Sequence, residues 1–422
     1  MILKYIGLIK NISSLSAIQI GNLLVPLLSF PYLVRVLGEE YFGQLSFCLS
    51  VIVFSQMIVD LGTGNYAARE ISVFKSDINR KIDFFINIIK LRFVVCFFLY
   101  FLLFGLTYSI QKFSNVKELL LLTYIACFGY AINCDWYFVG IQKNFSYLKI
   151  LLIGKLLNLL LIFIFVKEIS DINFIPIANG LSVILVSIFG IILALKDINL
   201  TNRKVIFSSL FNLYFLELGI KSSQLFVSKI AIEFYRGINP IILGLIADYK
   251  TVGYYVVAEK IITIIQTFQF PVGRALLPYM TEKSRDNGDG VVLKIGMSTL
   301  PYTVFIYVLL ALTVYFFSSE FVMIVSGSNN ENIVRNLKIL SIVLIFGGVN
   351  YFISMGVLIP LKKDRELAKM LVTVGVLNVA LVTCLIFILK DFGASISLVI
   401  SELILSIFML RKINYYRKQH EK

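Results

Sequence analysis

The stretch Val36-Leu-Gly-Glu-Glu-Tyr-Phe-Gly-Gln-Leu45 separates two apolar segments of membrane-spanning length. A second stretch, Ile246-Ala-Asp-Tyr-Lys-Thr-Val-Gly-Tyr-Tyr255, has the same pattern half a chain later, so that Gly43 and Gly253 fall at matching places. A proline lies upstream of each stretch. Corresponding proline- or glycine-interrupted segments in two halves of a chain are typical of transporters and point to the substrate site. The pattern therefore predicts two similar halves, each with an interrupted membrane helix.

The composition is that of a membrane protein. Hydrophobic residues make up 58% of the chain, charged residues only 15%, and the mean hydropathy is +0.87, whereas soluble domains carry about 25% charged residues. A helix needs about 20 mainly apolar residues to cross a bilayer, so we predict an all-α polytopic membrane protein with about 12 transmembrane helices. The candidate spans lie near 15–36, 42–63, 83–108, 117–140, 148–166, 176–195, 212–246, 252–276, 295–317, 334–359, 367–389 and 392–410.

The two halves are expected to form separate bundles. The polar segment 196–211 lies near the middle of the chain and is typical of a linker. We predict an N-terminal six-helix bundle over residues 1–200 and a C-terminal six-helix bundle over residues 201–422. Because six is an even number, both bundles enter the membrane from the same side, which relates them by a pseudo-two-fold axis along the membrane normal.

The net charge of +14 is explained by membrane topology rather than by an acidic partner. If the N-terminus is inside, most Lys and Arg fall in segments on that side, as the positive-inside rule requires. The basic clusters lie near 69–81, 203–204, 283–285, 362–365 and 411–422. We therefore expect both termini in the cytoplasm, a retained first helix rather than a cleaved signal peptide, and no nucleic-acid partner.

The sequence lacks the side-chain patterns of an enzyme or a metal protein. Its sole histidine, His420, lies in the polar tail, and its five cysteines all fall inside apolar segments. It contains no nucleophile elbow, no phosphate-binding glycine loop and no metal-ligand spacing. We predict no catalytic residue, no metal site and no cofactor, and we favour transport over catalysis.

Three ionisable residues near the middle of the seventh apolar segment are the main candidates for a binding site. Lys229, Glu233 and Arg236 are spaced so that a helix places them on one face. Charges at membrane depth are costly and usually face an interior cavity. They could form an internal ion pair that only stabilises the bundle, or a stripe that binds an anionic ligand. The excess of cations over carboxylates favours the ligand.

Further candidates lie beside the interrupted helices. Arg35 ends the first span, and Asp60, near the inner end of the second, is either a helix cap or loop salt bridge, or a functional carboxylate. Glu259 lies in the outer part of the eighth span. Pro240 should bend or break its helix, either as a structural kink or as a gating hinge, and Pro31 is its counterpart in the first half.

Other residues have simpler interpretations. Lys90, Arg92, Lys155 and Lys221 lie within about two turns of a cytoplasmic helix end, which favours snorkelling of their long side chains to the membrane surface. Trp136 lies at a helix end, which favours anchoring in the aromatic belt.

Several motifs resemble those of one family, in the same order. They follow the first, second and fourth spans and open the second half. They are Pro31-Tyr-Leu-Val-Arg-Val-Leu-Gly-Glu-Glu-Tyr-Phe-Gly43, Val59-Asp-Leu-Gly-Thr-Gly-Asn-Tyr-Ala-Ala-Arg-Glu70, Trp136-Tyr-Phe-Val-Gly-Ile-Gln142, Leu243-Gly244, Val252-Gly-Tyr-Tyr255 and Ala258-Glu-Lys-Ile261. These motifs are similar to those of the Wzx-type O-antigen and polysaccharide flippases, in the multidrug/oligosaccharidyl-lipid/polysaccharide exporter superfamily. Pro240 departs from the family pattern, in which a polar or charged residue is expected.

The resemblance implies a flippase of the bacterial plasma (inner) membrane. Its substrate would be an undecaprenyl-diphosphate-linked oligosaccharide, an O-antigen or capsule repeat unit, moved from the cytoplasmic to the outer leaflet by alternating access. Lys229, Arg236 and Arg35 would hold the head group, since a diphosphate needs fixed cations and arginine binds it bidentately.

On the same model a carboxylate would exchange protons or sodium ions to reset the cavity. Glu233 is the first candidate, with Glu259 or Asp60 as alternatives, and the hinges expected from the prolines are Pro240 and Pro31. The expected partners are the lipid-linked substrate, membrane lipids, and a polysaccharide polymerase with chain-length proteins.

Two alternatives stay open. A multidrug or metabolite cation antiporter of the same superfamily would have the same hydropathy. A polytopic polysaccharide polymerase would have a similar length, but such enzymes usually carry a large outer loop, which this chain lacks.

Overall fold

The computed structural model describes the backbone of residues 2–74, 77–198 and 213–420, and the side chains within these ranges except those of 2–26, 224–225, 227–235 and 420. Every regular element of the described backbone is a helix, which confirms the all-α prediction. Within the same ranges, nine helices are long and apolar enough to cross a membrane. The polytopic membrane architecture is therefore confirmed, whereas the count of about 12 helices is not.

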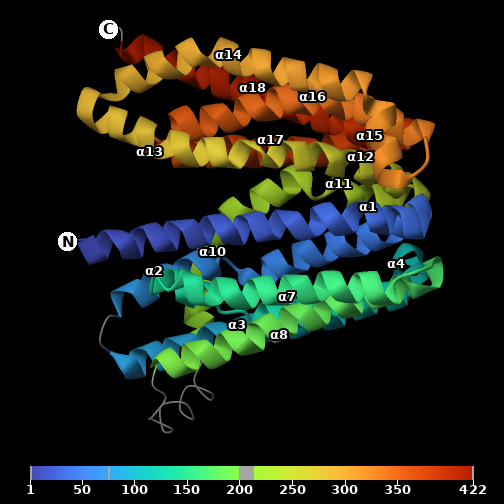
Figure 1. Ribbon diagram of the computed structural model, residues 1–422, viewed down its shortest axis with the longest axis horizontal. Helices are drawn as coiled ribbons and strands as arrows, with labels where there is room; N and C mark the ends of the chain where they lie inside the picture. Colours follow the sequence, from blue (N-terminus) through green and yellow to red (C-terminus); the bar gives the residue numbers. More distant parts are fainter. Residues whose placement is uncertain (1, 75–76, 199–212, 421–422) are drawn as a thin grey trace. The chain divides into compact units, whose positions relative to one another are not determined.

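The first compact unit comprises Met1–Leu37 and Cys48–Ile230. Its helices are α1 (Ile2–Asp60), α2 (Thr63–Val73), α3 (Ile78–Ser109), α4 (Gln111–Asn115), α5 (Lys117–Ala131), α6 (Asp135–Gly140), α7 (Asn144–Phe165), α8 (Phe174–Ile198) and most of α10 (Tyr214–Arg236). A 3-10 turn, Ile169–Asn173, precedes α8. Helices α5 and α7 both pack against α8, and Figure 1 shows α7 and α8 side by side.

Aromatic side chains form much of the core of this first unit. Trp136 is buried, and its ring lies 5.4 Å from that of Phe85 and 6.3 Å from that of Phe84, centroid to centroid. Its indole Nε1 donates to the backbone oxygen of Asn133 at 3.2 Å. The interpretation of Trp136 as an aromatic-belt anchor is therefore wrong, because the ring packs in the protein core.

The second compact unit comprises Gly38–Phe47 and Ala231–Lys422. After α10 come α11 (Asn239–Ile246), α12 (Tyr249–Thr267), α13 (Gln269–Asn287), α14 (Asp289–Phe316), α15 (Ser318–Ser326), α16 (Glu331–Ile353), α17 (Asp364–Leu389) and α18 (Asp391–His420). A π-helical turn, Ser354–Leu358, extends α16. Helix α16 packs against α12, α14 and α18, and it lies at the centre of this unit.

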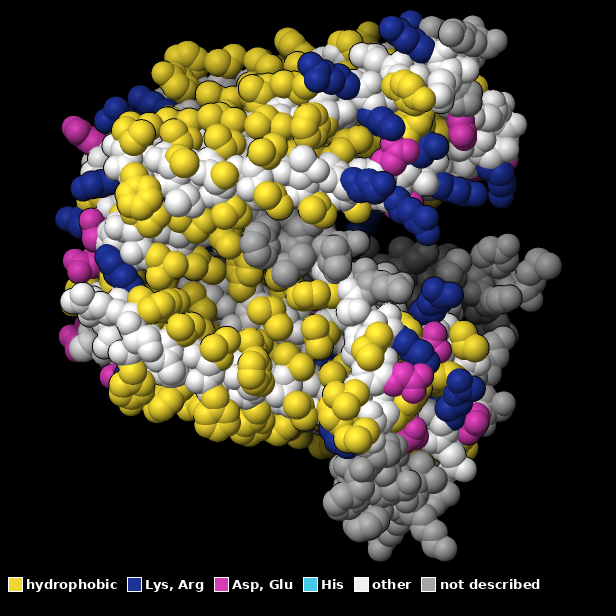
Figure 2. Space-filling view, turned by 180° about the vertical axis from the view of Figure 1, so that it is seen from behind, with side chains coloured by type: hydrophobic (Ala, Val, Ile, Leu, Met, Phe, Trp, Pro, Cys, Tyr) yellow, Lys and Arg dark blue, Asp and Glu magenta, His cyan; other side chains and the backbone are white. Residues whose placement is uncertain are grey.

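The surface of each unit fits a lipid environment. Large apolar side chains are exposed along α3 and α14, among them Phe98, Phe101 and Phe305. Figure 2 shows apolar side chains over the middle of the helices on the visible face of each unit, with charged side chains gathered toward the helix ends. Such a distribution keeps charges out of hydrocarbon and matches a membrane-spanning fold.

The two glycine-containing stretches quoted first contact each other within the second unit. A Cβ on Gly43 would lie 1.8 Å from the backbone oxygen of Tyr249, and a Cβ on Gly253 would lie 1.9 Å from that of Glu39. The contact is reciprocal, because each glycine meets the residue four positions before its counterpart. Only a residue without a Cβ permits such close backbone approach.

The helix breaks lie beside these glycines. Helix α1 is interrupted at Gly38, where φ is 68°, and not at Pro31, so the expected break at Pro31 is wrong. The break expected at Pro240 is confirmed, since α10 ends at Arg236 and α11 begins at Asn239 with the proline in its first turn.

The predicted boundary between residues 200 and 201 lies outside the described residues. The two compact units meet in the sequence between Ile230 and Ala231, inside α10, and the second unit also takes Gly38–Phe47 from α1. The division into bundles over 1–200 and 201–422 therefore stays a prediction.

Candidate functional site

The candidate site in the second unit is built around Arg236. This residue ends α10, directly before the break that precedes Pro240. Its Nη2 pairs with the Glu402 carboxylate on α18, and its Nη1 donates to Gln266 Oε1 on α12 at 2.9 Å. A cation at a helix C-terminus is also favoured by the helix dipole. The sequence therefore brings a guanidinium to the point where three helices meet.

Glu402 is fixed from its other side. Asn350 on α16 donates from Nδ2 to Glu402 Oε2 at 2.7 Å and to the Glu402 backbone oxygen at 3.0 Å. Ser406 donates to Asn350 Oδ1 at 2.7 Å, which sets the orientation of the Asn350 amide. Gly347 leaves room for the cluster, since a Cβ there would lie 2.6 Å from Gln266 Nε2. The carboxylate thus has polar partners on both oxygens.

The two charges of this pair differ in exposure. The Glu402 side chain is 1% exposed, whereas the Arg236 side chain is 36% exposed. A buried carboxylate needs a compensating charge and hydrogen bonds, and Arg236, Gln266 and Asn350 supply this environment. The Arg236 side chain is thus partly accessible, whereas the carboxylate is enclosed.

A neighbouring polar chain joins four helices of the second unit. Asn378 donates to Asn239 Oδ1 at 2.9 Å, Asn239 donates to the Tyr255 hydroxyl at 3.1 Å, and Ser401 donates to Asn378 Oδ1 at 2.9 Å. All four residues are fully buried. These bonds connect α11, α12, α17 and α18 beside the Pro240 break, and they fix the helices that carry Gln266 and Glu402.

The other predicted site residues of the second unit are less completely described. The side chains of Lys229 and Glu233 lie outside the described residues, although the backbone of both is helical. Glu259 is half-buried and accepts a hydrogen bond from the Thr263 hydroxyl at 2.8 Å. Of the three predicted stripe residues, Lys229, Glu233 and Arg236, the structure therefore describes the side-chain position of Arg236.

In the first unit, Arg35 is exposed on α1. It lines an open pocket of about 690 Å³ together with Tyr32, Lys167, Glu168 and Ser170. Because Arg35 and Arg236 belong to different units, they are described separately.

Asp60 forms a buried ion pair in the first unit. Its Oδ1 lies 2.5 Å from Arg92 Nη2, and both side chains are 2% exposed. Arg92 also donates from Nε to the Thr63 hydroxyl at 2.7 Å and from Nη1 to the Asn133 backbone oxygen at 3.0 Å. Asp60 in turn accepts from the backbone N–H of Gly64 at 3.0 Å. The snorkelling interpretation of Arg92 is wrong, because its guanidinium is enclosed by polar partners rather than extended to a membrane surface.

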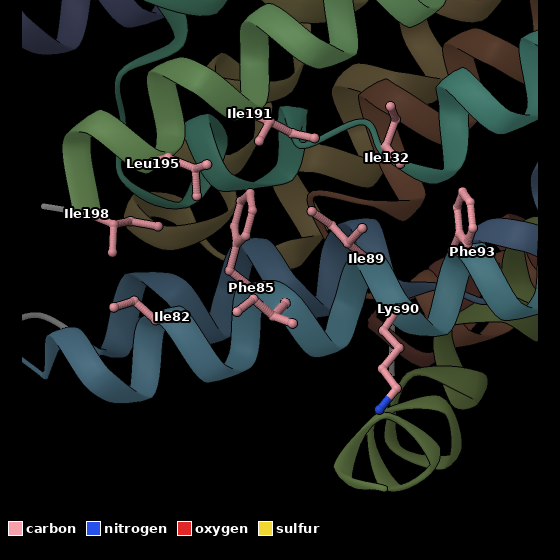
Figure 3. Close-up of a pocket in the computed structure, with 10 residues that line it drawn as sticks. Ile82, Phe85, Ile89, Lys90, Phe93, Ile132, Ile191, Leu195 and Ile198 are labelled. Atoms are coloured by element: carbon pink, nitrogen blue, oxygen red, sulfur yellow. The ribbon is translucent and has the colours of Figure 1, made fainter. Parts of the chain in front are cut away.

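An apolar pocket of about 540 Å³ lies between α3 and α8 of the first unit. In Figure 3, Phe85, Ile89, Ile191 and Leu195 point into this space, whereas Lys90 extends away from it toward another helix. The Lys90 ammonium lies 4.7 Å from the ring centroid of Phe215 on α10. The pocket walls therefore offer packing surface but no charged group for chemistry.

The sequence interpretation missed Glu402, Gln266 and Asn350. Glu402 is a single carboxylate within the apolar segment 392–410, and such a charge at membrane depth is a functional candidate by itself. That signal was present. Gln266 and Asn350 carry no charge, and their relevance follows from the tertiary contacts alone.

Comparison with known proteins places this chain in a family. The family described as "Polysaccharide biosynthesis protein" matches residues 8–284, well over half of the chain. The chain belongs to this family. A candidate O-antigen transporter of Escherichia coli (strain K12) is 25% identical over 412 residues, which cover 96% of each chain. A second candidate O-antigen transporter, from Shigella dysenteriae, is 23% identical and aligns over 96% of this chain and 99% of its own.

Solved structures of membrane transport proteins share the fold. The lipid II flippase MurJ in an inward closed conformation has a TM-score of 0.70 at 14% identity, covering 94% of this chain and 87% of that one. An inward-facing MATE family transporter of the MOP superfamily has a TM-score of 0.62 at 15% identity, covering 94% and 99%. The matched family and the two relatives confirm the resemblance to the Wzx-type flippases, and the solved structures show the shared fold.

Proposed function

We propose that this protein is a flippase that moves an undecaprenyl-diphosphate-linked oligosaccharide from the cytoplasmic to the outer leaflet of the bacterial inner membrane. The observation that carries the proposal is the partly exposed Arg236 side chain, whose guanidinium is held against the enclosed Glu402 within a membrane-spanning unit. A diphosphate is well matched by such a fixed cation, because arginine forms paired hydrogen bonds with phosphate oxygens in a low-dielectric setting. The O-antigen transporters similar over nearly the whole chain support the same substrate class.

The proposed cycle is alternating access by two six-helix bundles, over residues 1–200 and 201–422. Lys229, Arg236 and Arg35 are the proposed head-group cations. Pro240 is the proposed hinge of the second half, and the helix break beside it supports this role, whereas α1 is not broken at the other predicted hinge, Pro31. Both termini are proposed to lie in the cytoplasm, with a polysaccharide polymerase and chain-length proteins as partners.

The proposed coupling groups are Glu233, Glu259 and Asp60, exchanging protons or sodium ions. Glu259 is half-buried with one hydroxyl partner, which leaves it open to exchange. Asp60 is already paired with Arg92, so exchange there requires the ion pair to open. The structural contacts therefore favour Glu259 over Asp60.

The test is flipping of a labelled undecaprenyl-diphosphate-linked oligosaccharide by the full chain in vesicles, with surface polysaccharide measured in cells. Arg236→Ala and Lys229→Ala are each expected to abolish flipping and surface polysaccharide, measured per amount of protein in the membrane. Arg285→Ala is the matched control, since it removes an exposed arginine paired with Asp286 in the same unit. Normal surface polysaccharide in both cation variants would reject the proposed head-group site. Export of cationic drugs without flipping would favour an antiporter.

A further inference from the structure

Resting on the proposed function, we infer that Glu402 is an internal counter-anion that competes with the substrate diphosphate for Arg236. Glu402 would then be a positioning residue that sets how tightly the head group binds and how readily it leaves.

The carboxylate is the fixed partner of this pair. Its side chain is 1% exposed, and Asn350 holds both its Oε2 and the backbone oxygen of the same residue. Ser406 bonds to the Asn350 side chain and also to the Glu402 backbone oxygen at 3.0 Å. Moving the carboxylate would break its bond from Asn350 Nδ2 and leave buried polar groups unsatisfied, which is costly. Glu402 therefore stays in place when a ligand arrives.

The guanidinium is the partner that can change its contacts. Arg236 is the last residue of α10 and is followed by the break before α11. Its side chain is 36% exposed, and Gln266, to which its Nη1 donates, is neutral. A rotation of this side chain breaks the ion pair with Glu402 and the hydrogen bond with Gln266, and the charge can be matched again by a phosphate oxygen.

Gly347 on α16 leaves the space in which the Arg236–Glu402 pair lies. A Cβ there would lie 3.4 Å from both Arg236 Nη2 and Glu402 Oε1. A glycine at this place on α16 lets the two charged groups and Gln266 share one site. The guanidinium is thus held where a diphosphate and Glu402 act on the same donors.

Charge decides the consequence of this arrangement. Arg236 and Glu402 together carry no net charge, so a diphosphate that approaches the guanidinium also meets the field of a nearby carboxylate. Like charges at close range in a low-dielectric site weaken binding strongly. A transporter that must release its substrate gains from such competition, because a ligand that binds one state too tightly slows its own turnover. The competing anion lowers affinity and speeds release.

The test compares binding of farnesyl diphosphate, a short isoprenyl diphosphate, to the purified full chain in detergent by calorimetry. Glu402→Gln keeps the shape of the side chain and removes its charge. We expect it to bind farnesyl diphosphate more tightly by about fivefold or more, the lower end of typical coupling between sites. We also expect slower flipping in vesicles. Affinity equal to or weaker than that of the wild type would overturn the inference.

A matched control is Asp391→Asn, which neutralises another buried carboxylate on α18. Asp391 accepts from Asn336 on α16 at 2.6 Å, the same kind of bond that Asn350 makes to Glu402. This variant is expected to leave the affinity for farnesyl diphosphate unchanged. If it tightens binding as much as Glu402→Gln does, the effect is not specific to Arg236 and the inference is wrong.

Two further measurements separate the possible failures. If Glu402→Gln cannot be purified as a folded protein, Glu402→Asp decides, because it retains the charge but shortens its reach to Arg236. Intermediate tightening supports the inference, and unchanged or weaker binding rejects it. If Arg236→Ala abolishes flipping while neither Glu402 variant tightens binding, the inference fails and the proposed function stands. If Arg236→Ala flips normally, the proposed head-group role of Arg236 and the inference both fail, whereas the flippase activity stands.

Discussion

The two units each contain an arginine–carboxylate pair at the end of a helix, but the two pairs differ in access. Asp60 ends α1 and Arg236 ends α10. In the first unit both side chains of the Asp60–Arg92 pair are 2% exposed, whereas in the second Arg236 is 36% and Glu402 1% exposed. A closed pair stabilises the fold but has no route to a ligand. A pair with one accessible cation can exchange its partner. The difference suggests a structural role for the first pair and a binding role for the second.

Removing Arg92 should give the largest effect on stability. Arg92→Met leaves the Asp60 carboxylate buried without its cation, and breaking one side of a buried ion pair costs about 3–5 kcal/mol. We expect a sharply lower melting temperature in detergent and a loss of protein from the membrane. Arg236→Met is expected to lower the melting temperature less, because the Arg236 side chain is 36% exposed and water can take its place beside Glu402.

The double variant Asp60→Asn/Arg92→Met provides the control. Asparagine retains an oxygen that can accept from the Gly64 N–H and removes the unpaired charge. Its melting temperature should recover part of the loss. If the double variant is no more stable than Arg92→Met, the cost does not come from the stranded carboxylate, and the contrast between the units is weakened.

Much of the fold could be predicted from composition, but the pairing of charges could not. The apolar segments gave the helices, and Pro240 gave the break before α11, because both signals are local. The matching positions of Gly43 and Gly253 in the two halves indicated that the stretches correspond, and in the structure these stretches are in contact. The break at Gly38 was assigned to Pro31, since proline is the stronger helix breaker in a sequence. Arg92 was assigned to the membrane surface, because its partner Asp60 is distant in the chain.

The site was also only partly predictable, because single charged residues can be recognised in a sequence whereas their distant partners cannot. Arg236 stood out as a charge at membrane depth, and Glu402 carried the same signal. Their pairing joins residues that lie far apart in sequence. Asn350 and Gln266 gain their importance only from the charged groups they contact, and a neutral amide in an apolar helix does not reveal its neighbours.

A smaller effect is expected from filling the space beside the Arg236–Glu402 pair. Gly347→Ala places a Cβ 2.6 Å from Gln266 Nε2 and should shift Gln266 and crowd Arg236. Overpacking of this kind costs about 1–3 kcal/mol. We expect a moderate fall in melting temperature and a clear fall in flipping. Gly105→Ala on α3 is the control, because no atom lies within 4 Å of a Cβ there. Equal effects of the two variants would show that the space at Gly347 is not used by the site.

The smallest effects are expected from removing one hydroxyl group beside each ion pair, that of Ser406 near Arg236–Glu402 and that of Thr63 near Asp60–Arg92. Ser406→Ala removes a donor to Asn350, a neutral group, and should cost about 1 kcal/mol, the usual net value of one hydrogen bond. Thr63→Val removes the acceptor of the Arg92 Nε–H and leaves a buried charged donor unsatisfied, so it should cost more, up to about 3 kcal/mol. Melting temperatures of the two variants measured side by side decide the order. The reverse order would mean that the pair in the first unit is wetter than its burial indicates, and that the contrast between a closed and an open pair does not hold.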